Sequence, residues 1–161
     1  MGRYMLTEAQ RVVLEAAGSY VAEMPPVDKR ASTKTARRLE AIRATGLSRE
    51  AVMPMLAADG GTVDDRIEDH TLLAVHAGDD LVFPAFQFVD GVEVPHWGQV
   101  CPVVPHGDHR AISAESFMMH PACDLVIDDA EVSPVAWLLA GGDPGIVVRL
   151  ARHAFHQYPA T

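Results

Sequence analysis

The sequence predicts a mainly α-helical fold with one small β-hairpin, and three observations support this prediction. Apolar residues recur at spacings of three and four over residues 5–23 and again over 133–152. Two helix starts, Ser133-Pro134 and Asp143-Pro144, each pair a capping side chain with a proline at the first helical position. A Gly78-Asp79-Asp80 turn separates two short apolar runs, as expected for a hairpin.

Residues 133–152 predict a tight helix, glycine turn and second helix. Gly141 and Gly142 end the first helix, because a residue without a β-carbon enters the left-handed conformation at little cost. Core packing and a docking surface for a partner are equally good interpretations of this corner. The apolar residues expected on its inner faces are Val135, Leu138, Leu139, Ile146, Val147, Leu150 and Ala151, with Trp137 at the edge.

The first 45 residues are expected to form an N-terminal helical segment with a basic face. An amphipathic helix over 5–23 should end at Pro25-Pro26. The following segment, 29–43, is rich in Lys and Arg, and in a helix Lys34, Arg37 and Arg38 share one face. This face is either a solvated surface or a contact for phosphate groups.

Residues 46–161 are expected to hold a helix-turn-helix-like module, the β-hairpin and a helical partner-binding domain. Ser48 starts one short helix, and after the Gly60-Gly61 turn Thr62 caps another. The second helix is acidic, since Asp64, Asp65, Glu68 and Asp69 surround the single Arg66. Carboxylates facing a phosphate polyanion would oppose binding, so we interpret this module as a degenerate helix-turn-helix.

The predicted hairpin pairs residues 72–75 with 81–83, and Pro84 makes the second strand an edge strand or ends it. Phe83, Phe86 and Phe88 follow closely and are expected in the core, with a contact surface beside the core as the second interpretation. Residues 89–107 are rich in proline and glycine, which indicates a loop with one short helix. A further short helix over 112–119 and a turn at Asp128-Asp129 lead into the corner.

The 161-residue chain has a net charge of −9, and the charge is unevenly distributed. Residues 1–50 carry nine Lys and Arg against six Asp and Glu, whereas residues 51–161 carry four against sixteen. A basic N-terminal part suits an acidic or phosphate-bearing partner, and the acidic remainder suits a basic protein. The absence of an apolar span or signal-peptide core, and the presence of only two cysteines, predict a cytoplasmic protein that does not bind membranes.

No catalytic motif is present, which favours a binding protein over an enzyme. His106, His109, His120 and Cys123 have a spacing that superficially resembles a structural zinc site. One thiolate without a glycine-flanked knuckle is a weak set of ligands, so we expect no metal and no cofactor.

Three blocks in fixed order resemble the toxin-binding domain of the Xre/MbcA/ParS class of antitoxins, the partners of RES-domain toxins. They are LLAV-x5-LVFPAFQF at 72–88, SAESFMMHPACDLVIDD at 113–129 and SPVAWLLAGGDPGIVVRLAR at 133–152. The resemblance implies a small helical domain that binds its toxin and occludes the active site of an NAD-degrading enzyme. It therefore implies a hetero-oligomer in which this chain has no catalytic role.

The resemblance also assigns residues to partner binding. Phe83, Pro84, Phe86 and Gln87 match its hairpin motif, and Ser133, Trp137, Gly141, Gly142, Asp143 and Pro144 match its corner. By analogy, Arg149, Arg152, His153 and His156 of the last helix would approach the toxin's pocket.

Two alternatives stay open. Family members commonly repress their own promoter through an N-terminal helix-turn-helix, whereas here the candidate recognition helix is acidic. Binding of promoter DNA is therefore in doubt, or it has passed to the basic segment 29–43, which would also suit a stand-alone DNA-binding regulator. The other alternative is a small metal-dependent enzyme at His106, His109, His120 and Cys123.

Overall fold

The computed structural model of the chain describes residues 31–56 and 62–156, together with Ala9, Val12, Val13 and Ala16. Contacts divide the chain into two units, Met1–Lys34 and Thr35–Thr161. The four isolated residues of the first unit are helical and exposed, in agreement with the helix predicted over 5–23. The following predicted features lie outside the described residues: the remainder of that helix, the Pro25-Pro26 stop, Lys29, Arg30, the Gly60-Gly61 turn and the tail after His156.

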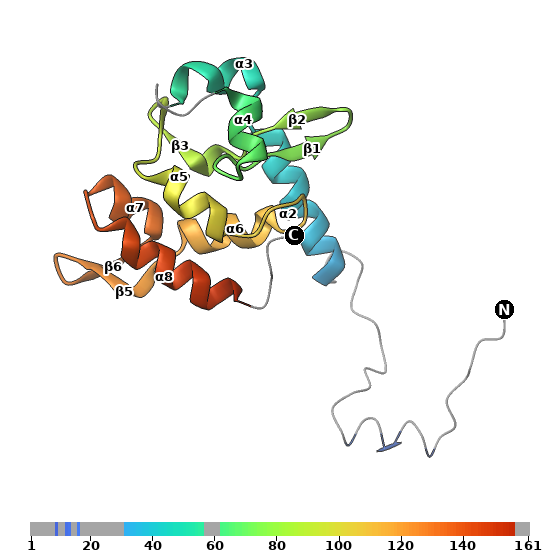
Figure 1. The fold of residues 1–161 in the computed structure, drawn as a ribbon. Helices are drawn as coiled ribbons and strands as arrows, with labels where there is room; N and C mark the ends of the chain where they lie inside the picture. Colours follow the sequence, from blue (N-terminus) through green and yellow to red (C-terminus); the bar gives the residue numbers. More distant parts are fainter. Residues whose placement is uncertain (1–8, 10–11, 14–15, 17–30, 57–61, 157–161) are drawn as a thin grey trace. The chain divides into compact units, whose positions relative to one another are not determined.

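The described chain is built from helices and short two-stranded antiparallel pieces, which confirms the predicted fold class (Figure 1). Most elements are shorter than ten residues, and α2 and α8 are the long helices. In chain order the elements are α2 (Ala31–Thr45), α3 (Arg49–Val52), the 3₁₀ turn η2 (Met53–Met55), α4 (Val63–Glu68), β1 (Val75–Ala77), β2 (Asp80–Val82), η3 (Ala85–Gln87), β3 (Phe88–Val89), β4 (Val92–Glu93), α5 (Trp97–Val100), η4 (Cys101–Val103), α6 (Ala111–Met119), β5 (Ala122–Ile127), β6 (Ala130–Val132), α7 (Pro134–Leu139) and α8 (Pro144–Phe155).

Helix α2 shares its core with the elements that follow it. Its Leu39 and Ile42 are buried in the same apolar cluster as side chains of β1, α5 and α8. The helix ends before Gly46, where an added β-carbon would lie 2.9 Å from a methyl carbon of Val82. The domain boundary expected after residue 45 stays a prediction, while in the structure α2 packs with the later elements and the second unit begins at Thr35.

The predicted hairpin is present but shorter than expected. β1 and β2 pair Val75 with Val82, and residues 72–74 stay outside the strand. The reason is that the backbone of Leu73 bonds to a side chain, as described below, and not to a neighbouring strand. The second strand ends at Val82, one residue before the predicted end, and Phe83 forms an isolated bridge with Leu47 just before Pro84.

The structure also contains two hairpins whose strands the sequence did not reveal. β3 pairs with β4 through Asp90 and Gly91, and β5 pairs with β6 through the Asp128-Asp129 turn. Asp128 and Asp129 have φ values of 50° and 64°. Positive φ at both central residues is the geometry that matches the twist of a two-residue hairpin, and Asp tolerates it better than most residues.

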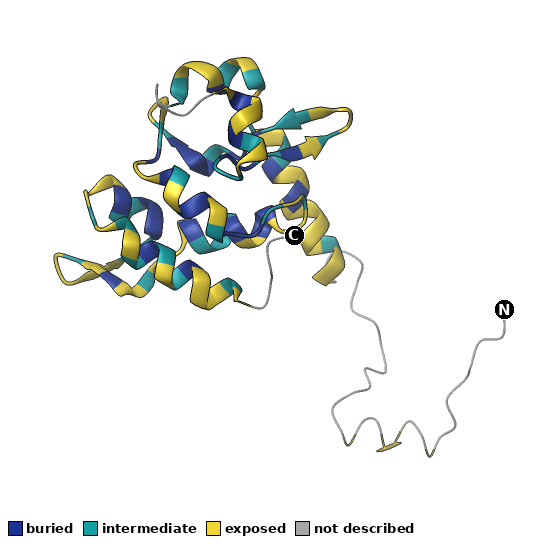
Figure 2. Ribbon diagram, viewed as in Figure 1, coloured by how far each residue is buried: buried dark blue, intermediate teal, exposed yellow. Residues whose placement is uncertain are grey.

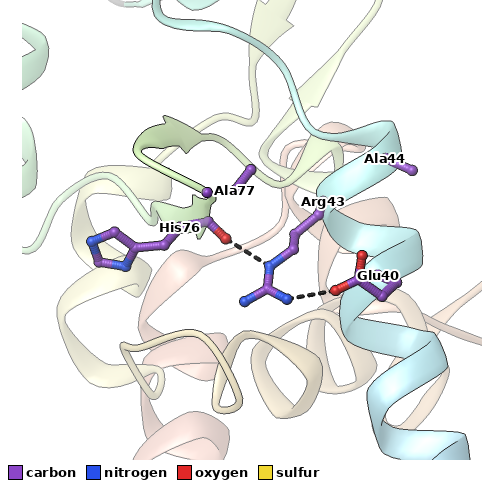
Figure 3. A pocket seen from close by; sticks show the side chains of 6 residues that line it. Glu40, Arg43, Ala44, His76 and Ala77 are labelled. Carbon is purple, nitrogen blue, oxygen red and sulfur yellow. Dashed lines mark hydrogen bonds and ion pairs between the residues drawn. The ribbon is translucent and has the colours of Figure 1, made fainter.

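Arg43 ties the β1–β2 hairpin to α2. Its Nε donates to the His76 carbonyl at 2.6 Å, and one terminal nitrogen pairs with Glu40 at 2.6 Å (Figure 3). The other lies 3.4 Å from Asp108, whose carboxylate also accepts from the backbone N–H of His76 at 3.0 Å. Partial burial alone would raise the pKa of Asp108, but its bonds with His76 and the charges of His76 and Arg43 together lower it. These contacts border an open hollow of about 470 Å³, lined by Glu40, Arg43, Ala44, His76, Ala77 and Gly78.

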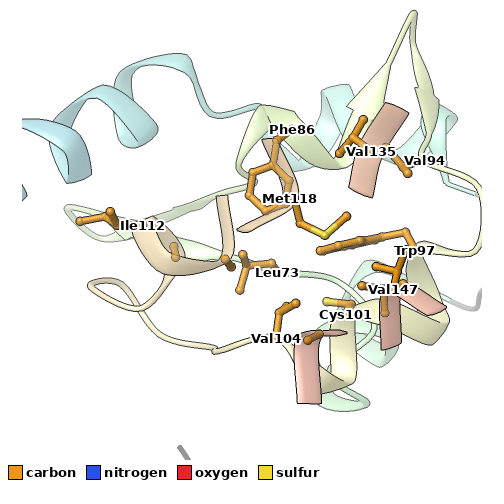
Figure 4. Close-up of a cluster of buried hydrophobic side chains, with 14 of the residues drawn as sticks. Leu73, Phe86, Val94, Trp97, Cys101, Val104, Ile112, Met118, Val135 and Val147 are labelled. Carbon is orange, nitrogen blue, oxygen red and sulfur yellow. The ribbon is translucent and has the colours of Figure 1, made fainter. Parts of the chain in front are cut away.

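The main core lies where α2, α5, α6, α7 and α8 meet, and it is almost entirely apolar (Figures 2 and 4). Trp97 lies at its centre with 1 % of its surface exposed, and its ring meets Phe86 edge to face at 5.6 Å. A smaller cluster around Val52, Val63 and Phe83 holds α3 and α4 against the hairpin segment. Burying a large side chain of this kind contributes about 1.5–3 kcal/mol, so these clusters supply most of the stabilisation.

One polar side chain, that of Gln87, lies inside this core with no exposed surface. Its Oε1 accepts from the Leu73 backbone N–H and from the Trp97 indole N–H, each at 2.8 Å. Its Nε2 donates to the carbonyls of Leu73 at 2.9 Å and Pro84 at 3.2 Å. All four hydrogen-bonding positions of the amide are therefore used.

The corner at 133–152 forms as the sequence predicts. Ser133 caps α7 by accepting from the Ala136 N–H, and Asp143 caps α8 by accepting from the Gly145 N–H at 2.8 Å. Gly141 has a φ of 83°, which favours glycine. The Trp137 indole donates to the Asp143 carbonyl at 3.1 Å and covers Gly142, where a β-carbon would lie 2.3 Å from the ring. Leu139 is the exception to the predicted inner face, since 48 % of it is exposed.

The Gln87→Leu variant is expected to lower the free energy of unfolding by about 3 kcal/mol or more. Leucine would leave the Trp97 N–H and the Leu73 backbone groups unpaired in the core, where each such group costs about 1–3 kcal/mol. Urea unfolding followed by tryptophan fluorescence measures the change. The control is Gln99→Leu, at an exposed glutamine of α5, which should shift stability by less than about 0.5 kcal/mol. Equal stabilities of the two variants would contradict the role assigned to Gln87.

Candidate partner-binding surface

The residues that match the hairpin motif of the resemblance are part of the core. Phe83 and Gln87 are fully buried, Phe86 is 6 % exposed, and Pro84 is buried with them. They have almost no surface with which to contact another protein. Their burial makes these four side chains part of the frame that positions the exposed surfaces, and their assignment to partner binding stays a prediction.

The corner residues are placed differently, at the surface. Trp137, Gly142 and Pro144 are partly buried there, whereas Gly141 and Asp143 are exposed. The bond from Trp137 to Asp143 and the packing of Trp137 on Gly142 fix the angle between α7 and α8. Trp137 thus stabilises the geometry of the corner, and the exposed turn lies at the start of α8.

The four predicted residues of α8 lie together on its outward face. Arg149, Arg152, His153 and His156 are all exposed, and their spacings of three, four and seven place them on one side of the helix. Val147 and Ala151, both fully buried, hold the opposite side against the core. This arrangement creates a cationic ridge on a well-anchored helix.

The basic residues predicted on α2 are also exposed. Lys34, Arg37 and Arg38 lie together on one exposed side of α2, and Arg38 lies one helical turn before the buried Ile42. Within residues 31–56 and 62–156, the Lys and Arg side chains that make neither a hydrogen bond nor an ion pair all lie on two helices, α2 and α8. They are Lys34, Arg37, Arg38, Arg149 and Arg152.

Arg66, the single basic residue of the acidic helix α4, is 5 % exposed. Its guanidinium pairs with Glu93 of β4 and donates to the hydroxyl and carbonyl of Thr71 at 2.7 and 2.8 Å. The acidic residues of α4 have local roles, since Asp64 pairs with Arg49 at 2.8 Å and Asp65 closes a capping box with Thr62. Hydrogen bonds from Thr62 lower the pKa of Asp65. The structure thus gives Arg66 a packing role and leaves carboxylates on the outside of α4.

The four residues with zinc-like spacing do not form a metal site. Among the described residues, no three His, Cys, Asp or Glu side chains lie close enough together to hold an ion. Nε2 of His106 donates to the Cys101 carbonyl at 2.8 Å, and Nδ1 of His120 lies 2.8 Å from the Ser116 carbonyl. Cys123 is exposed on β5, and burial raises the pKa of the other thiol, Cys101, well above its usual value.

A groove that sequence reasoning did not predict joins the two cationic helices. It has a volume of about 340 Å³ and lies between α2, α6 and the end of α8. Phe117 and Phe155 meet edge to face at 5.4 Å in its wall. The described residues that line it are Arg38, Ile112, Ser113, Ser116, Phe117, Ala154 and Phe155.

No protein-family model, curated protein or solved structure matches this chain. Among the described residues, none of the helices has the length and apolar character needed to cross a membrane.

Acidification is expected to destabilise the fold through His106. Burial lowers the pKa of His106 from its usual 6.5, and the nearby His70 lowers it further, although the bond to Cys101 opposes this. The folded state therefore favours the neutral ring, and this stability is lost as pH falls below about 6.5. Thermal unfolding at about pH 7.5 and pH 5.5 should show a smaller loss of Tm for His106→Gln than for the unsubstituted chain. The control is His109→Gln, which changes an exposed histidine and should lose as much Tm on acidification as the unsubstituted chain. An equal loss of Tm for His106→Gln and His109→Gln would contradict this assignment.

Proposed function

We propose that this chain is the antitoxin of a type II toxin–antitoxin pair, which binds a RES-domain toxin and occludes its NAD-degrading active site. The observation that carries the proposal is the cationic ridge of α8, held at a fixed angle by the Trp137 corner. The three sequence blocks that resemble the antitoxin class add support. The proposal places the chain in the cytoplasm, in a hetero-oligomer with its toxin.

The ridge suits inhibition by occlusion because it is rigid and its charges are unsatisfied. Arg149 and Arg152 make no ion pair within the described chain, so they can meet carboxylates of a partner without first breaking internal contacts. A guanidinium binds a carboxylate through two parallel hydrogen bonds, which fixes orientation as well as adding affinity. The buried Val147 and Ala151 keep the helix in place, and this reduces the entropy lost on binding.

Occlusion requires no reactive group in the inhibitor, and the chemistry of this chain is consistent with that role. Its buried thiol, Cys101, has a raised pKa, which disfavours the nucleophilic thiolate. We therefore propose a binding protein without catalytic activity of its own.

The double variant Arg149→Glu/Arg152→Glu is expected to lose inhibition of the toxin. Reversing two central charges on the ridge should weaken binding at least about tenfold, since each close charge pair contributes on the order of 1.5 kcal/mol or more. The measurements are calorimetric titration with the RES-domain protein encoded by the adjacent gene, made catalytically inactive, and NAD levels in cells that express the active toxin.

The matched control for this experiment is Lys34→Glu/Arg37→Glu, which makes the same charge change on α2 and should still inhibit. Circular dichroism verifies that both double variants fold. The proposal is contradicted if the adjacent gene encodes no RES-domain protein, if the unsubstituted chain does not bind that protein, or if the purified chain consumes NAD unaided.

A second proposal is that the chain regulates transcription by binding DNA through α2. The observation that favours it is the exposure of Lys34, Arg37 and Arg38 on one face without internal partners. In this case the chain, alone or with its toxin, should bind its upstream DNA with an affinity that falls steeply as salt rises. Fluorescence anisotropy should then show loss of binding for Lys34→Glu/Arg37→Glu and retention for Arg149→Glu/Arg152→Glu. The absence of any salt-sensitive binding at low ionic strength would exclude this role.

A further inference from the structure

We infer that the groove between α2, α6 and α8 docks a segment of the partner protein that places an apolar side chain beside a carboxylate. The inference rests on the proposed antitoxin function and names a second contact for the same partner. Its basis is the chemistry of the groove lining, which is apolar in the wall and cationic at one edge.

The apolar wall comes from Ile112 and Phe117 of α6 and from Ala154 and Phe155 of α8. Phe117 and Phe155 are only partly buried, although their rings pack together with centroids 5.4 Å apart. Covering their remaining exposed area with another apolar side chain is favourable in free energy, because it removes apolar surface from water. An apolar occupant therefore gains free energy from this wall.

The cationic edge is Arg38, which is exposed and has no hydrogen-bond or ion-pair partner within the described chain. None of the described residues that line the groove is acidic, and the other polar side chains in the lining are Ser113 and Ser116. Glu40, the acidic residue of α2, lines the other hollow and is paired with Arg43. The charge of Arg38 is thus not balanced within the groove, and a carboxylate of the occupant can balance it.

A protein segment fits this lining better than a nucleic acid does. The two phenylalanine rings meet edge to face at an interplanar angle of 69°, which offers no continuous flat platform for stacked bases. Residues 51–161 carry four Lys and Arg against sixteen Asp and Glu, and this excess of negative charge opposes a long polyanion. An apolar side chain with a nearby Asp or Glu satisfies the wall and the edge together.

The test compares Arg38→Glu with Arg37→Glu in the full chain. Both variants make the same charge change in adjacent positions of α2, but only Arg38 lines the groove. Calorimetric titration with the inactive RES-domain protein from the adjacent gene should show binding at least about tenfold weaker for Arg38→Glu, and within about twofold of normal for Arg37→Glu. A photoreactive p-benzoyl-phenylalanine placed at the exposed Ser113 should cross-link to a partner peptide that contains both an apolar and an acidic residue.

The outcomes separate the two proposals. Equal binding by Arg38→Glu and the unsubstituted chain would overturn the groove assignment and leave the antitoxin proposal standing. Failure of the unsubstituted chain to bind the RES-domain protein would contradict both. Loss of DNA binding on Arg38→Glu with unchanged toxin binding, or a Ser113 cross-link to a second copy of this chain, would also overturn the inference.

Discussion

The buried amide of Gln87 is the interaction on which the arrangement of this fold depends. It forms hydrogen bonds with the backbone of Leu73 in place of a neighbouring strand. It also accepts a hydrogen bond from the indole N–H of the central Trp97 and donates one to the Pro84 carbonyl. These contacts join the segment before β1, the turn after β2 and the first residue of α5. A polar group in a dry core is stabilising only when all of its hydrogen bonds are made, and here none is missing. The elements are too short to hold their own register, so this fixed set of bonds determines where the hairpin and α5 lie.

The charged residues follow a similar division between internal and external roles. Arg43, Arg49 and Arg66 are paired with carboxylates of other elements, and the Arg66–Glu93 pair is nearly buried. A buried pair adds little net stability compared with apolar packing, but removing one partner is costly, so it specifies which elements meet. The remaining exposed cations on α2 and α8 contribute little to folding, which leaves them available to bind other molecules.

The parts of the structure that could be predicted from sequence are those specified by local signals. Ser133, Gly141 and Asp143 define the corner because caps and glycine turns act within a few residues. The ridge of α8 is likewise visible in the sequence, since the spacing of its residues alone places them on one face. The sequence did not predict strands as short as Phe88–Val89, because long-range contacts and not alternation hold them.

Sequence reasoning predicts the burial of some residues and misses that of others. Phe83, Phe86 and Phe88 are predicted in the core and are buried there. Gln87 is assigned to partner binding, and its burial follows only from its bonds to Leu73 and Trp97. Arg66 shows the same difficulty, because its partner Glu93 lies 27 residues away. The groove at Arg38 had no sequence signal, since its lining comes from three separated helices.

The division of charge has a consequence for recognition. Acidic side chains such as Asp128 and Asp129 lie at the exposed tip of the β5–β6 hairpin, whereas the unpaired cations lie on α2 and α8. The proposed partner therefore meets surfaces of opposite sign on this chain, and a wrong orientation brings like charges together. In the proposed complex, an apolar contact in the groove also fixes the partner against both cationic helices, because the groove lies between them. The core built on Gln87 and Trp97 keeps these helices in place, so a residue with no surface of its own still determines the geometry of binding.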